Sequence, residues 1–129
     1  MQDAGIDRHP QTVSEMPWEY AKILKLLPHS VTVSRSRDGV WFLEDGASYQ
    51  IAYYPNVREF DLSVAASDNT KLNDVKSILT VFFPNSYEEA YQYLREVKQG
   101  KEVNLVLDKR AFATECYIDE GIMIIGLEP

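Results

Sequence analysis

The sequence predicts an α+β fold: a curved, mainly antiparallel sheet of about six to seven strands packed against two helices. Three observations lead to this prediction. The chain has 129 residues, which suits one hydrophobic core. Short runs of alternating apolar and polar residues, separated by turn residues, are typical of antiparallel strands. Two further segments carry apolar residues at the spacing of a helix.

The first helix is expected to follow a flexible arm. Residues 1–13 contain few apolar side chains and predict the arm, which leaves residues 14–129 as a single domain. Ser14 is the expected N-cap, and Pro28 ends the helix because proline disfavours helical dihedrals in the residue before it. The apolar stripe of this helix would consist of Tyr20, Ile23, Leu24 and Leu27.

The second helix has signals at both ends and is expected over residues 86–99. Ser86 and Glu89 have the spacing of a capping box, in which each side chain accepts a backbone N–H that the first turn leaves free. Gly100 stands where a left-handed residue commonly ends a helix. Its inner face would carry Tyr87, Ala90, Tyr91, Leu94 and Val97.

Strands are expected on both sides of the second helix. They cover residues 31–34, 40–43, 48–54, 58–64, 102–107, 111–118 and 122–127. The first four are joined by short turns and predict an antiparallel meander. The last is apolar on both faces, which predicts a central strand that is covered on both sides. Polar residues at 66–76 predict a loop.

One segment between the two groups of strands is ambiguous. Residues 78–83 are β-branched and aromatic, which favours a strand, and Pro84 ends the run at strand length. Leu72, Val75 and Leu79 nevertheless fall near helical spacing. We predict a strand here, with a helix as the alternative.

The composition indicates which binding partners and which cellular compartment to expect. The net charge is −7, and the 13 basic residues are scattered, which argues against direct nucleic-acid binding and favours a basic protein partner. No apolar run reaches the length of a membrane span. A lone cysteine, Cys116, and residues 1–13 without a secretory pattern predict a cytoplasmic protein.

Motifs for catalysis, cofactors and metals are missing from the sequence. His9 and His29 have no ligand-spaced neighbour, and Cys116 lies on an alternating strand as a small buried hydrophobe. Glu59 and Asp61 are two apart on one strand and could share a cation, although a solvated strand face explains them as well. We therefore expect no enzyme, no cofactor and no metal site.

Aromatic side chains are the other unusual feature of the surface. The chain has eight tyrosines and two tryptophans, residue types that are enriched at binding hot spots. Tyr53 and Tyr54 are adjacent on a strand and face opposite sides, as do Trp41 and Phe42. One member of each pair therefore lies outside the main core, where it is exposed, covered by another element, or used for binding.

The favoured function is a small protein-binding inhibitor of the immunity or antitoxin type, or a phage anti-defence protein, which neutralises a basic toxin or nuclease. Acidic residues in turns and on one strand, together with one tyrosine, would form the binding surface. The predicted partner-binding residues are Glu44, Asp45, Tyr54, Glu59, Asp61, Asp119 and Glu120.

Two alternatives stay open at this stage. The first is a small-ligand module with an aromatic-lined pocket between the sheet and a helix. Its pocket would be lined by Tyr49, Tyr53, Tyr87 or Tyr91. The second is an enzyme whose site is assembled from dispersed carboxylates, which would require a cleft with shifted pKa values.

Overall fold

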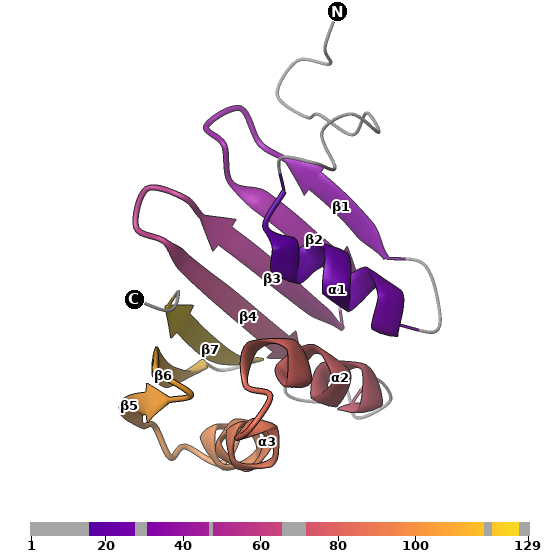
Figure 1. The fold of residues 1–129 in the computed structure, drawn as a ribbon. Helices are drawn as coiled ribbons and strands as arrows, with labels where there is room; N and C mark the ends of the chain where they lie inside the picture. Colours follow the sequence, from indigo (N-terminus) through magenta and orange to yellow (C-terminus); the bar gives the residue numbers. More distant parts are fainter. Residues whose placement is uncertain (1–15, 28–30, 47, 66–71, 118–119, 127–129) are drawn as a thin grey trace, which may run out of the picture.

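The computed structural model describes residues 16–27, 31–46, 48–65, 72–117 and 120–126, and within these it has three helices and seven strands. The helices are α1 (Trp18–Leu26), α2 (Leu72–Phe82) and α3 (Tyr87–Val97). The strands are β1 (Thr32–Arg35), β2 (Trp41–Asp45), β3 (Tyr49–Tyr54), β4 (Glu59–Ala65), β5 (Asn104–Leu107), β6 (Arg110–Tyr117) and β7 (Glu120–Gly126). The predicted α+β class with a mainly antiparallel sheet is confirmed (Figure 1).

The sheet consists of two antiparallel meanders that meet at its centre. The strand order is β1-β2-β3-β4-β7-β6-β5. β4 and β7 pair along their whole length, from Glu59 opposite Gly126 to Ala65 opposite Glu120. Because α2 and α3 stand between β4 and β5 in the chain, they carry it across to the far edge of the sheet. The second meander then returns to the centre.

All three helices lie on the same side of the sheet (Figure 1). The burial of the two central strands shows this directly, since buried and partly exposed residues alternate along both β4 and β7. Phe60, Leu62 and Val64 point toward the helices from β4, and Met123 and Ile125 do so from β7. The predicted central position of this last strand is confirmed, but its predicted cover on both sides is not, because Ile122 and Ile124 on its other face are partly exposed.

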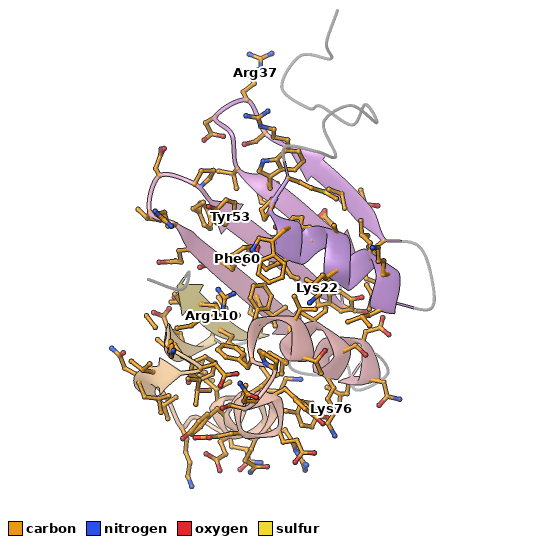
Figure 2. The ribbon with its side chains drawn as sticks, viewed as in Figure 1. Lys22, Arg37, Tyr53, Phe60, Lys76 and Arg110 are labelled. Carbon is orange, nitrogen blue, oxygen red and sulfur yellow. The ribbon has the colours of Figure 1, made fainter. Side chains whose placement is uncertain are left out.

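A chain of aromatic rings runs through the core between the sheet and the helices. Phe60 lies 4.5 Å from Tyr53 and 4.8 Å from Phe82, measured between ring centroids, and Figure 2 shows Tyr53 and Phe60 beside α1 on the face of the sheet that carries the helices. Phe83 then contacts Phe112 edge to face at 5.4 Å. Such ring pairs add to the free energy gained by burial alone.

A buried ion pair links the sheet to α1 and α2. The Arg110 guanidinium, at the start of β6, lies 3.3 Å from the Glu19 carboxylate of α1, and both side chains are about 3% exposed. Arg110 also donates from Nε to the Phe82 carbonyl at the end of α2, and from Nη1 to the Gly126 carbonyl of β7. The buried charge is thus paired and hydrogen-bonded.

Residues 78–83 do not form the predicted strand. Residues 78–82 are the second half of α2, and Phe83 follows its end. Strand propensity is overridden here because Val75, Ile78, Leu79 and Phe82 fall on one helical stripe that packs into the core. The predicted two helices therefore become three, and the predicted loop shrinks, because Leu72–Phe82 is helical.

The predicted capping box of α3 is also wrong. Ser86 precedes the helix but makes no side-chain cap, and Glu89 instead accepts a hydrogen bond from the Tyr93 hydroxyl. Asp108, in the turn between β5 and β6, accepts from the Asn85 backbone N–H and from the Ser86 hydroxyl. The helix start is therefore fixed by a residue more than twenty positions away, which local spacing does not reveal.

Several other predicted features differ in detail or lie outside the described residues. The 1–13 arm and the Ser14 cap are among those outside, and α1 begins at Trp18, after Pro17. Glu44 and Asp45, predicted in a turn, are the last residues of β2. None of the described helices has both the length and the apolar character needed to cross a membrane.

Candidate functional site

The face of the sheet opposite the helices, here called the open face, is not packed against any described element (Figure 1). The register of the strands decides which residues it carries. Its central row runs across the sheet with each residue opposite the next: Ser34, Phe42, Ala52, Asp61, Ile124, Ala113 and Asn104. The rows on either side contain Tyr54, Glu59, Gly126, Ala111 and Val106, and Glu44, Gln50, Ser63, Ile122 and Glu115.

Apolar side chains lie on the open face on both sides of the central strand β4. Phe42, Ile122 and Ile124 are partly exposed, although large branched and aromatic residues are usually found inside. Ala52, which lies between Phe42 and Asp61 in the central row, is only 2% exposed. This face is therefore more apolar than the alternation of polar and apolar residues expected for a solvated sheet face.

The charged residues of the open face have one sign. Its strand positions include five carboxylates, on Glu44, Glu59, Asp61, Glu115 and Glu120. Among the described strands, no lysine or arginine occupies a position on this face, whereas Arg35 and Arg110 both face the helices. Arg58 is nearby in sequence but lies exposed in the turn before β4.

Asp61 is the central carboxylate, and its surroundings disfavour its charge. Its direct cross-strand neighbours are Ala52 and Ile124, so methyl groups flank it on both sides. Its Oδ1 atom is buried and has no hydrogen-bond partner. Burial raises the pKa of Asp61 to about 7, and a hydrogen bond with Glu59 and the charges of Glu59 and Glu115 add to the increase.

Tyr54 joins this group from the adjacent strand. It lies directly opposite Glu59 on β4 and diagonal to Asp61. Burial raises the pKa of the Tyr54 hydroxyl, as do the negative charges of Asp61 and Glu59. The phenol therefore stays neutral and can donate a hydrogen bond. On β6, the Tyr117 hydroxyl donates to Glu115 at 2.8 Å and holds that carboxylate in place.

A shallow hollow of about 220 Å³ lies on the half of the open face formed by β4, β7, β6 and β5. Its floor consists of small residues, because Ala111, Ala113 and Gly126 project little above the sheet. Glu59 and Arg58 stand at its edge. A space of this size, which several water molecules would fill at about 30 Å³ each, is large enough for a partner side chain.

Five of the seven predicted partner-binding residues are brought together on the open face. They are Glu44, Tyr54, Glu59, Asp61 and Glu120. Asp45 lies at the end of β2 on the side that faces the helices, opposite Tyr49. Asp119 lies outside the described residues. Glu115, Phe42, Ile122 and Ile124 complete the face but were not predicted for it.

The tyrosines of the predicted pocket lie at different places: Tyr91 lines one cavity, and Tyr49 lines a separate hollow of about 240 Å³. Tyr49 is buried and donates to Asp74, and Tyr53 packs on Phe60. A cavity of about 500 Å³ between α2 and α3 is lined by Tyr91 but not by the other three tyrosines. In the described part of the chain, no three side chains of histidine, cysteine, aspartate or glutamate are grouped to hold a metal ion.

Comparison with known proteins adds no further constraint. No protein-family model, no curated protein and no solved structure matches this chain. The open face must therefore be interpreted from its own residues. These residues can contact another molecule in three ways: a neutral phenol can donate a hydrogen bond, several carboxylates can accept one, and apolar side chains on both sides of β4 can be buried.

Proposed function

We propose that this protein is a binding protein that neutralises a basic protein, such as a toxin or a nuclease, by occluding it with the open face. One observation carries the proposal: the open face combines apolar side chains on both sides of its central strand with five carboxylates and, in its described strands, no basic residue. The function is that of an immunity protein, an antitoxin or an anti-defence protein of a phage.

The apolar side chains of the open face support tight binding. Phe42, Ile122 and Ile124 can lose their remaining exposure when a partner covers them, and each buried apolar Å² contributes about 25 cal/mol. Tyr54 adds a large side chain with few torsions, which orders at low entropic cost. These residues stand on paired strands, so little backbone order has to be acquired on binding.

The carboxylates support the choice of a basic partner. A net charge of −7 speeds encounter with a positively charged surface, and the one-signed face orients it. A protein that acts on nucleic acids needs lysines and arginines for the phosphates. Carboxylates held on a rigid sheet can occupy those same side chains, so binding and inhibition would coincide.

A growth-rescue assay tests this function. Each protein encoded beside this one is produced in a test host, and any that arrests growth is co-produced with the wild type, with Glu59→Lys, or with Glu88→Lys. Glu88 is an exposed acidic residue on α3, so its variant changes the net charge equally but leaves the open face intact. We expect rescue by the wild type and Glu88→Lys, and loss of rescue with Glu59→Lys.

Two outcomes would contradict the proposal. Rescue by both charge variants alike would remove the open face as the binding surface. Failure of the purified wild type to bind any of these neighbouring products in calorimetry would remove the inhibitor function itself. Circular dichroism of each variant checks that a lost rescue reflects lost binding rather than unfolding.

A further inference from the structure

We propose that the open face exchanges a proton for its partner: at neutral pH Asp61 is protonated in a fraction of the free molecules, and this proton is released to solvent when a cationic side chain of the partner lies against it. The inference rests on the proposed function and adds its regulation, namely that binding strengthens as pH rises through neutrality.

The groups that face Asp61 from every neighbouring strand favour this exchange. On β4 itself Glu59 lies two residues away, and Ser63 lies on the other side. β3 contributes Tyr54, Gln50 and Ala52, and β2 contributes Glu44. β7 contributes Ile122, Ile124 and Glu120, and β6 contributes Glu115. Arg58, exposed in the turn before β4, stands at the edge of the hollow beside Glu59, and every other charged group around Asp61 is acidic. No charge on the strands themselves compensates a negative Asp61.

The position of the carboxyl itself is the second support. A surface aspartate normally has both oxygens in water, but Oδ1 of Asp61 is buried without a hydrogen-bond partner. An ionised carboxylate at this point is costly, since burial and like charges both oppose it. The raised pKa of about 7 agrees with this geometry. The free protein at neutral pH is therefore a mixture of protonated and ionised forms.

A lysine or arginine of the partner shifts Asp61 from the protonated to the ionised form. A cation against Glu59 and Asp61 favours the ionised carboxylate, as does the hydrogen bond that it donates to an oxygen left without one. The carboxyl proton goes to the buffer, and the cation takes its place. Because no basic residue of the described strands occupies this position on the free face, the exchange depends on the partner.

The first experiment measures Asp61 in the protein alone. Carbon-detected NMR follows its side-chain carboxyl through a pH titration in the wild type, in Glu59→Gln and in Glu88→Gln. We expect a midpoint near neutrality in the wild type, a lower one in Glu59→Gln, and no change in Glu88→Gln. A wild-type midpoint in the ordinary aspartate range would overturn the inference while leaving the proposed function untouched.

The second experiment measures the exchange. Calorimetry with the rescued toxin, and with a synthetic peptide of alternating arginine and leucine as a defined probe, is repeated in two buffers of different ionisation enthalpy. At about pH 7 we expect release of about half a proton, and affinity should fall about tenfold from about pH 8 to about pH 6. In Asp61→Asn both effects should disappear.

The outcomes separate the two proposals. Binding without proton release, or with the same pH dependence in Asp61→Asn, overturns the exchange but supports the binding function. A neutral Asp61 midpoint together with no binding of toxin or peptide removes the binding function and the exchange that depends on it. Circular dichroism of Asp61→Asn across the same pH range shows whether the variant stays folded.

Discussion

The two faces of the sheet provide opposite environments for a carboxylate. On the helix side, Glu19 is buried against Arg110, which is itself held by the carbonyls of Phe82 and Gly126. On the open face, Asp61 sits among methyl groups and other carboxylates, with one oxygen unpartnered. In the first arrangement, the chain itself supplies the partners of both buried charges. In the second, the strands around Asp61 supply no cation for its carboxylate.

This difference separates a residue that holds the fold from one that costs stability. In a buried, hydrogen-bonded ion pair each charge is compensated by the other. Removal of one partner therefore lowers the free energy of unfolding. A destabilised charge at a surface is instead typical of functional sites, where stability is exchanged for binding. The contrast can be tested by substitutions on each face.

The largest effect is expected for Arg110→Met. Glu19 would then be left buried without its cation, and two backbone carbonyls would lose a donor, so the free energy of unfolding should fall by about 3–5 kcal/mol. Urea denaturation measures it, with the exposed Lys101→Met as the control. The double variant Glu19→Leu/Arg110→Met should recover much of the loss. A single variant within about 1 kcal/mol of the wild type would show that the pair is not buried in solution.

A phenylalanine on each face gives the most direct comparison. Phe60 is fully buried and contacts three other rings, so Phe60→Ala should cost about 3–5 kcal/mol. Phe42 is partly exposed on the open face, and Phe42→Ala should cost about 1 kcal/mol while weakening partner binding. Chemical denaturation and calorimetry measure the two effects. Equal losses of stability would mean that Phe42 is as well covered as Phe60.

Asp61→Asn should stabilise the protein in a pH-dependent way. The pKa of Asp61 is raised from 3.8 to about 7 on folding, so the folded state holds the proton more tightly and stability is lost as pH rises between these values. The variant should therefore be about 1 kcal/mol more stable than the wild type at about pH 8, after allowance for solvent screening, and equal to it below about pH 4. Thermal unfolding across this range measures the difference, and a constant gap would contradict it.

The smallest effect concerns the start of α3. Asp108→Asn keeps a residue that tolerates the left-handed backbone there, with φ 49°, but removes the charge that holds Asn85 and Ser86. We expect a loss of about 0.5–1 kcal/mol, and Glu89→Ala, which removes the side-chain acceptor, should change stability by less than about 0.3 kcal/mol. If Glu89→Ala were the more damaging variant, the predicted capping box would be operating in solution after all.

Much of the fold could be predicted because local patterns are strong in this chain. Alternation places Phe60, Leu62 and Val64 on one face of β4, and the spacing from Ala90 to Val97 predicts α3. Alternation predicts that adjacent aromatics face opposite sides. The structure shows which is which: Trp41 is buried, and Phe42 is on the open face. The segment 78–82 was missed because its residue types favour a strand, while its helical conformation is stabilised by tertiary packing.

The candidate site was predictable only in part. Tyr54, Glu59 and Asp61 are close in sequence or on paired strands, so their proximity follows from a hairpin. Glu115, Ile122 and Ile124 come from strands that follow two helices, and their place beside Asp61 depends on β7 pairing with β4. No local signal specifies that pairing, since strand order depends on contacts between distant segments.

The sequence by itself determined the kinds of surface this protein has, because charge, aromatic content and alternation are properties of short segments. It settled that one face of each strand is apolar and that the chain is strongly acidic. The tertiary structure alone decided which of the other faces adjoin, which carboxylate is flanked by methyl groups, and which is paired with arginine. The reason is physical: the cost of a charge depends on its neighbours in space, and the groups around Asp61 come from five different strands.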